Sequence, residues 1–140
     1  MKKLMSILAA GMFALLLSSC GSNSPEAVVK KALNATLDGD GETYTELMFR
    51  FDESEWEGSD KQREKQMAKK AREIEKQAKR MAKADDDEKI DKFEIIDVTI
   101  DFDDEDRAEV EVKFFFEDGH TRKTTFYVRR TTEGNWRLVS

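Results

Sequence analysis

The chain has 140 residues, the length of one domain, and its 30 acidic residues outnumber 24 basic ones to give a net charge of −6. This balance argues against a general nucleic-acid-binding protein, whose surface carries excess positive charge. Apolar residues recur at regular positions in the second half, so the chain need not be disordered despite its many charges. We expect a single globular domain with a modest core.

The first twenty residues have the layout of a secretory leader that ends in the only cysteine. Lys2 and Lys3 precede an apolar run, 4–17, which is shorter than the about 20 residues of a membrane span and suits the core of a signal peptide. The run ends in Leu17-Ser18-Ser19-Cys20, which closely resembles the lipobox of bacterial lipoproteins. The resemblance implies that 1–19 is a signal peptide and that Cys20 carries acyl chains such as palmitate. A chance cysteine in an ordinary leader would instead leave a free thiol.

Residues 20–23 would then be the lipidated cysteine and a short tether. The mature chain would carry 22 basic and 30 acidic residues, a net charge of −8. Even with Ser24 the segment after Cys20 is four residues long and reaches at most about 14 Å, so the domain should begin close to the lipid headgroups. Gly21, Ser22 and Asn23 match neither the aspartate of inner-membrane retention nor the acidic run of surface export. We therefore expect a lipid anchor in the bacterial cell membrane or outer membrane, facing the periplasm.

Three helices are predicted in the first half of the domain. Ser24 is suited to cap a helix that begins at Pro25 and stops at Gly39. A second helix is predicted over 42–51, and a third over 60–84, which lacks Gly and Pro. In the third helix the apolar residues recur at spacings of four, three, four and three and form a narrow seam: Met67, Ala71, Ile74, Ala78 and Met81.

The third helix is strongly basic in an acidic protein. Between Lys61 and Lys83 it holds ten Lys or Arg residues and three Glu, a local net charge of +7. Such a face could contact anionic lipid headgroups, which the short tether would bring near, or an acidic partner. It could also be a solvated face that balances the acidic sheet. The candidate contact residues are Lys65, Lys69, Arg72, Lys76 and Arg80.

From Phe93 onward the apolar period changes to two, which predicts four half-buried strands. The residues predicted to face inward are all even-numbered, from Ile96 to Phe102, Ala108 to Phe116, Thr124 to Val128, and Trp136 to Leu138. Residues paired across a hairpin share a face, so each loop must hold an odd number of residues unless a bulge intervenes. The pattern predicts a four-stranded antiparallel meander whose apolar face is covered by the helices.

The order of these segments resembles the small bacterial lipoproteins of the DUF4878 type, in the lumazine-binding and NTF2-like group. The resemblance rests on the leader, on "SPEAVVKKALNATLDGDGETYTELM" and on the late strand "EGNWRLV". It implies an α+β, NTF2-like cone over 24–140, in which N-terminal helices pack on the curved sheet. The family implies no agreed activity, and the wider fold includes ketosteroid isomerase as well as non-catalytic binding modules.

No catalytic residue, metal or cofactor is predicted. A nucleophile would need a base, and the only histidine, His120, falls in a predicted tight turn. The acidic runs "DFDDEDR" and "ADDDEK" lack the spacing of a calcium loop and suit soluble turns. No phosphate-binding loop is present.

Several aromatic residues could either line a pocket or fill the core. The candidates are Phe49, Trp56, Phe114, Phe126 and Trp136.

We expect a non-enzymatic binding or interaction module whose partners are the membrane, through the lipid on Cys20, and an unidentified envelope protein or small ligand. The alternative is a small-molecule carrier or isomerase-like enzyme that uses the concave face of the sheet, which would need a cavity of at least about 300 Å³.

Overall fold

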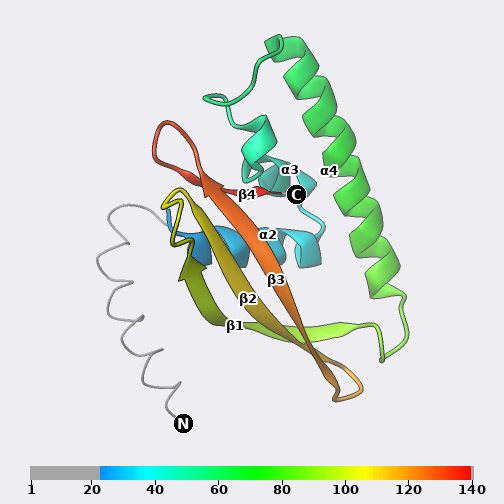
Figure 1. Cartoon of the computed structure of the whole chain (residues 1–140). Helices are drawn as coiled ribbons and strands as arrows, with labels where there is room; N and C mark the ends of the chain where they lie inside the picture. Colours follow the sequence, from blue (N-terminus) through cyan, green and yellow to red (C-terminus); the bar gives the residue numbers. More distant parts are fainter. Residues whose placement is uncertain (1–22, 140) are drawn as a thin grey trace.

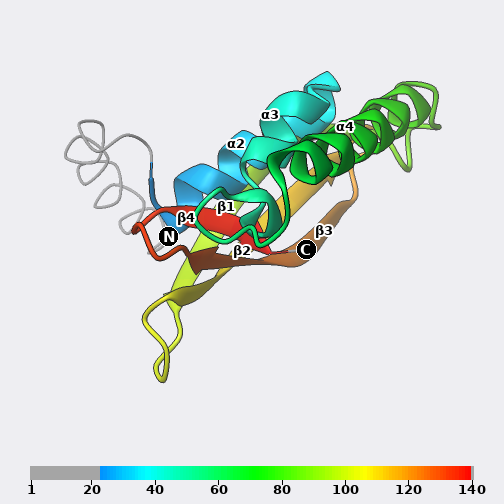
Figure 2. The same cartoon turned by 90° about the horizontal axis from the view of Figure 1, so that it is seen from above.

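The computed structural model describes residues 23–139, so the leader and Cys20 lie outside the described residues. Figures 1 and 2 show the helices gathered on one face of a curved sheet. The α+β class predicted from the sequence is confirmed. The elements are α2 (Pro25–Asp38), α3 (Gly41–Glu46), the 3-10 helix η2 (Phe49–Phe51), α4 (Asp60–Ala82), β1 (Ile90–Ile100), β2 (Arg107–Phe116), β3 (Thr121–Arg130) and β4 (Trp136–Val139).

Helix α2 forms as its sequence predicts. The Ser24 side chain accepts a hydrogen bond from the Ala27 N–H at 3.1 Å, and Pro25 opens the first turn. Gly39 ends the helix in the left-handed conformation, with φ of 74°. The apolar stripe of α2, which includes Val28 and Val29, is buried against the sheet.

The second predicted helix is shorter than expected. Helix α3 ends at Glu46, and the chain becomes extended at Met48, with φ of −85° and ψ of 133°. The reason is tertiary, because the Leu47 carbonyl accepts a hydrogen bond of 2.7 Å from the Leu138 N–H of β4. At this point the backbone bonds to the edge of the sheet in place of continuing the helix, and a 3-10 helix, η2, follows.

Helix α4 packs through the predicted seam. It starts from a capping box formed by Ser59 and Gln62, and it ends at Ala82, two residues before the predicted end. Ile74 is buried, and the four other seam residues are half-buried. A Cβ at Gly41 would lie 2.2 Å from the Ala71 carbonyl oxygen, so only glycine allows α3 to approach α4 this closely.

The sheet is the predicted antiparallel meander, in the order β1-β2-β3-β4. All three hairpin loops hold an odd number of residues, at 102–106, 117–119 and 132–134. Gly119 and Gly134 close the two three-residue loops with φ of 98° and 88°. The even-numbered residues of β2 are buried, as are Val128, Trp136 and Leu138, while Phe126 is half-buried.

Strand β1 departs from the predicted pattern. Ile95 pairs with Val112 and Asp97 pairs with Glu111, so Ile96 is an extra residue in a bulge. Before the bulge, odd-numbered Phe93 and Ile95 therefore take the covered face.

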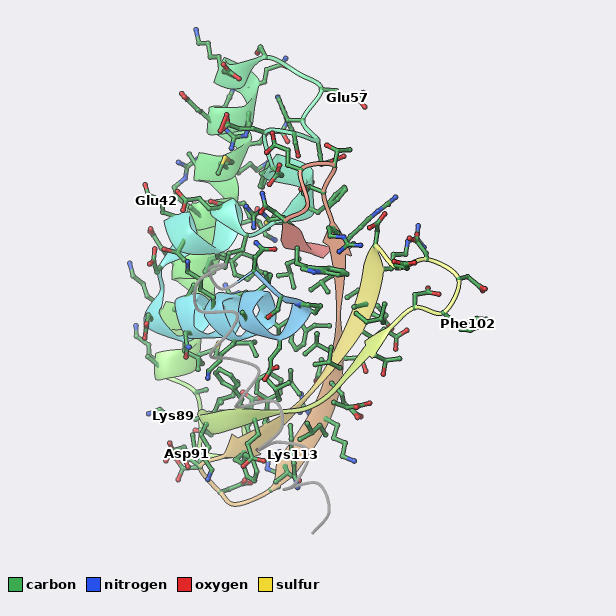
Figure 3. The ribbon with its side chains drawn as sticks, turned by 90° about the vertical axis from the view of Figure 1, so that its left-hand side faces the viewer. Glu42, Glu57, Lys89, Asp91, Phe102 and Lys113 are labelled. Carbon is green, nitrogen blue, oxygen red and sulfur yellow. The ribbon has the colours of Figure 1, made fainter. Side chains whose placement is uncertain are left out.

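The prediction of an even-numbered buried face in β1 is wrong beyond the bulge as well. Val98 and Ile100 remain 37% and 46% exposed, and Phe102 is 97% exposed. The cause is that the β1–β2 hairpin extends past the helices, as Figure 3 shows at Phe102.

Candidate functional site

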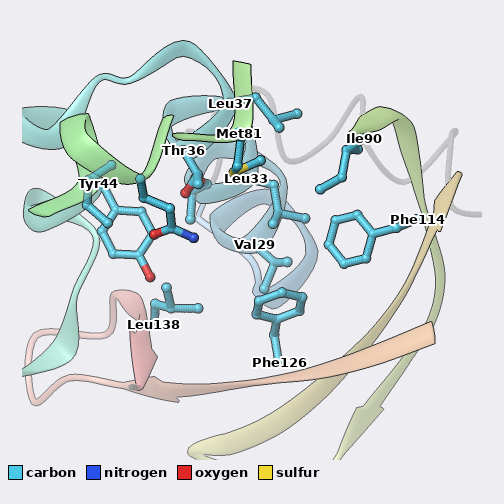
Figure 4. Close-up of a pocket in the computed structure, with 13 residues that line it drawn as sticks. Val29, Leu33, Thr36, Leu37, Tyr44, Met81, Ile90, Phe114, Phe126 and Leu138 are labelled. Atoms are coloured by element: carbon cyan, nitrogen blue, oxygen red, sulfur yellow. The ribbon is translucent and has the colours of Figure 1, made fainter. Parts of the chain in front are cut away.

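A small cavity lies between α2, α4 and the inner face of the sheet, with a volume of about 210 Å³ (Figure 4). Phe114 and Phe126 point from the sheet toward Val29 and Leu33 of α2. Most of its lining is apolar. The remaining residues around it are Ala32, Thr36, Leu37, Tyr44, Ile74, Gln77, Met81, Ile90 and Leu138.

The polar groups of this cavity are neutral. Burial raises the pKa of Tyr44, so its phenol stays protonated. The Thr36 hydroxyl already donates to the Ala32 carbonyl at 2.9 Å, and Gln77 contributes an amide. The cavity can hold a small apolar group beside a hydroxyl or amide, and none of its lining residues is an acid or a histidine.

The five aromatic candidates do not gather at one place. Phe114 and Phe126 line the cavity. The Arg129 guanidinium carbon lies over the Phe49 ring, 5.3 Å from the ring centroid. The Arg130 guanidinium carbon lies over the buried Trp136 ring, 5.2 Å from the ring centroid. Trp56 donates from Nε1 to the Ser59 carbonyl at 3.0 Å, before α4. These three residues lie outside the cavity lining.

A larger hollow of about 640 Å³ lies along the strands at the base of the β1–β2 hairpin. Its lining includes four of the six large hydrophobic residues that are exposed among residues 23–139, namely Ile100, Phe102, Tyr127 and Val139. Arg107 and Arg129 lie beside them. We call this surface the hairpin hollow.

Sequence reasoning did not identify the hairpin hollow. Tyr127 and Val139 are cross-strand partners at odd positions, where the alternation predicts solvent-facing residues. Polar residues normally occupy such solvent-facing positions. The aromatic and the aliphatic side chain found there were therefore the only sign in the sequence of an exposed apolar surface. Their convergence with the hairpin tip depends on strand pairing.

Three carboxyl groups among residues 23–139 have a pKa that departs clearly from its usual value, and in each of them the pKa is lowered. The Thr43 hydroxyl lowers the pKa of Asp40, and the His120 backbone N–H lowers that of Asp118. Burial would raise the pKa of Asp52, but hydrogen bonds from Ser54 and the charge of Arg137 outweigh it. These three groups stay ionised at neutral pH, which does not suit a general base that must take up a proton.

His120 lies in the exposed turn between β2 and β3, as expected. Its Nδ1 is 2.6 Å from the Asp118 carboxylate, and its ring stacks on Phe116 with centroids 4.4 Å apart.

Within residues 23–139, no group of three or more His, Cys, Asp or Glu residues could hold a metal ion. The same residues include no helix that is long and apolar enough to cross a bilayer.

The five predicted contact residues of α4 are all exposed, on the side of the helix opposite its apolar seam. The only salt bridge within α4 among the described residues joins Lys70 to Glu73, at 3.6 Å. The candidate cations are therefore free to bind an external group.

Family comparison agrees with this architecture. A family described as a domain of unknown function, DUF4878, matches residues 18–139. The chain belongs to the DUF4878 family. Among curated proteins, none matches this DUF4878 chain.

A crystal structure at 2.00 Å resolution of a Campylobacter jejuni protein, provisionally described as an NTF2-like transpeptidase, is similar to this DUF4878 protein. The TM-score is 0.60 at 17% identity, and the match covers 84% of this chain and 98% of the other. At this identity the likeness concerns the fold alone, and it confirms the predicted NTF2-like arrangement.

Proposed function

We propose that this DUF4878 protein is a non-enzymatic interaction module, held at a bacterial envelope membrane by lipid on Cys20. The observation that carries the proposal is the hairpin hollow. Exposed apolar residues normally scatter singly over a soluble surface, whereas Tyr127 and Val139 form an exposed cross-strand pair in one hollow with Phe102, and polar groups surround them. Such a grouping is typical of an interaction site. Tyr, Phe and Arg, which are enriched in protein interfaces, all occur there.

The interior of the cone supports this reading over the carrier or enzyme alternative. Its cavity of about 210 Å³ is smaller than the about 300 Å³ at which ligand pockets usually begin. The transpeptidase description of the structural neighbour would require a nucleophile beside a base. Among residues 23–139, the side-chain hydrogen bond of the His120 ring runs to Asp118 and not to a hydroxyl.

The start of the described chain is consistent with a close anchor. The Asn23 side chain accepts a hydrogen bond of 2.6 Å from the Trp136 N–H, which pins the chain beside β4. Cys20 is three residues earlier, within about 11 Å along an extended chain. The hairpin that carries Phe102 is tied to the same region, because Asp106 forms an ion pair of 2.9 Å with Arg130, which pairs with Trp136.

Photo-crosslinking in native membranes tests the interaction site. A photoreactive residue in place of Tyr127 should give discrete protein adducts, and Phe102→Ser should reduce them. The same residue in place of exposed Lys123, on the same strand, is the matched control. Equal adducts at both positions, or none at position 127, would contradict the proposed site.

Metabolic labelling with an acyl probe tests the anchor separately. The wild-type protein should take up the label, and Cys20→Ala should lose it and leave an uncleaved or soluble product, because the anchor of the mature protein is the lipid and not the leader. Label that persists on the Cys20→Ala protein would show that Cys20 is not the acylated residue.

A further inference from the structure

Helix α4 carries two stripes with the same spacing. The apolar seam faces α2 and α3, and a second stripe of exposed cations recurs at spacings of four, three, four and three. On a helix of 3.6 residues per turn the two stripes lie about 160° apart. We define the cationic stripe as Lys65, Lys69, Arg72, Lys76 and Lys79, with Arg80 beside it.

The cationic stripe keeps an excess of positive charge. Within the described residues, none of its members forms a salt bridge. Helical geometry places the three glutamates of α4, Glu64, Glu73 and Glu75, on the flanks of the stripe. A protein of net charge −6 thus concentrates positive charge along one straight line of more than 20 Å, at about 1.5 Å per residue.

The stripe points away from the proposed anchor. Helix α2 begins beside Asn23 and ends against α4, where Gly39 approaches Ala78. Its 14 residues put about 21 Å between the tether and α4. Figures 1 and 2 show α4 across the molecule from the start of α2. A tether of about 11 Å cannot bring the outer face of α4 onto the same bilayer while Cys20 is inserted.

The spacing indicates what kind of anion fits. A four–three repeat keeps a stripe facing a second helix that crosses at about 20°, which is how apolar seams of coiled coils work. A lipid surface or a flexible polyanion requires only charge density and no such repeat. Most members of the stripe are also lysines, which act as point charges and do not form the paired fork with which arginine grips phosphate.

We propose that the cationic stripe binds an acidic α-helix of a partner protein, whose carboxylates recur at spacings of four and three. The inference deepens the proposed interaction function and rests on it: the hairpin hollow supplies apolar contact, and α4 supplies a charged surface on the opposite side of the molecule. Isolated surface ion pairs contribute little, so binding needs several aligned pairs at once.

Two synthetic helical peptides of about 28 residues, long enough to form helix, provide the test. Both contain the same number of glutamates in an alanine and glutamine background. One places them at four–three spacing on a single face, and the other distributes them around the helix. Binding to the lipidated protein in zwitterionic vesicles is measured by fluorescence anisotropy, with free polyglutamate and anionic vesicles as further probes.

The matched variants change the same number of charges at exposed positions. Lys65→Gln with Lys69→Gln and Lys76→Gln removes three cations from the stripe, and Lys30→Gln with Lys31→Gln and Lys123→Gln removes three elsewhere. The stripe variant should bind the aligned peptide roughly tenfold more weakly, from the loss of three surface pairs, and the control variant should bind nearly as the wild type does. Circular dichroism checks that both variants fold.

Three results would overturn the proposal. The two peptides could bind equally, which would mean that charge alone is recognised. The two variants could weaken binding equally, which would mean that the stripe is not the site. Anionic vesicles could bind while the aligned peptide does not, which would assign the stripe to lipid. Failure of the anchor would appear separately, as lost acyl label with peptide binding retained.

Discussion

Asp52 shows how a single side chain ties the helical half of the domain to its last strand. It follows η2 in the chain, and its Oδ2 lies 2.9 Å from Nε of Arg137 in the last strand. Its side chain is only 8% exposed, so water screens the pair weakly. The Ser54 N–H and hydroxyl occupy its other oxygen at 2.9 and 2.6 Å. The carboxylate is therefore held ionised in the folded state, with its pKa lowered.

This arrangement predicts a pH-dependent contribution to stability. Because the folded-state pKa of Asp52 is depressed, its stabilisation is present above the unfolded-state value of about 3.9 and is lost as pH falls through the folded-state value. Asp52→Asn should reduce the free energy of unfolding at neutral pH by about 1.5–3 kcal/mol, the usual worth of charged hydrogen bonds. Urea denaturation from neutral to strongly acidic pH measures the difference.

The difference should shrink toward zero in acid, where wild-type Asp52 is protonated. Asp87→Asn, at an exposed turn, serves as a control that should change stability little at any pH. A deficit in the Asp52→Asn protein that stays constant across the whole range would show that shape, and not charge, accounts for its effect.

At the scale of elements, local chemistry predicts most of the fold. Ser24, Pro25 and Gly39 bound α2 because capping and φ restrictions act within a few residues. The odd loop lengths follow from the two-residue period alone. The break in the second helix and the Ile96 bulge could not be predicted in this way. Both depend on hydrogen bonds to strands far along the chain, from Leu138 to Leu47 and across β1 and β2.

The bulge leads to a prediction about register. Ile95 and Asp97 already pair with consecutive residues of β2, so deleting Ile96 would join them into a regular ladder. After the deletion, the side chains on both sides of position 96 should still point to the same faces of the sheet as before, and the protein should still unfold cooperatively. Deleting Glu109 from β2 should instead turn buried residues outward, because a one-residue slip inverts every later side chain.

Urea denaturation and NMR dispersion of the two deletion proteins compare these outcomes. Ile96 is only half-buried, so its lost side chain is a minor cost beside the inversion of a strand whose inner residues Val110 and Val112 are fully buried. Equal loss of folding in both proteins would mean that the bulge is required for the curvature of the sheet.

At the scale of the whole molecule, the candidate surfaces depend on what the fold brings together. Sequence reasoning identified the α4 cations, because helical spacing is visible in the chain. It could not place them relative to the tether or gather Phe102 with Tyr127, since those relations follow from hydrogen bonds and packing between remote segments. The start of α2 and the β1–β2 hairpin lie toward one side of the domain, and α4, which carries the cationic stripe, lies toward the other (Figure 1).

This orientation predicts unequal distances from the membrane. If Cys20 is lipidated, a cysteine introduced elsewhere is the only free thiol, so single sites can carry a spin label. Glu133 lies in the β3–β4 loop beside the strand that holds Asn23, and Lys76 lies on α4 across the molecule. Both side chains are exposed and tolerate substitution. Labels at Glu133→Cys and Lys76→Cys are compared in vesicles that contain gadolinium-chelating headgroups.

Relaxation by the headgroup gadolinium should be much stronger at position 133 than at position 76, because α2 alone holds α4 about 21 Å from the tether. Adding anionic lipid should leave this order unchanged, since the tether is too short for the domain to turn α4 onto the bilayer. A stronger effect at position 76 in anionic vesicles would mean that the cations of α4 lie on the membrane, and the acidic-helix proposal would then lose its geometric basis.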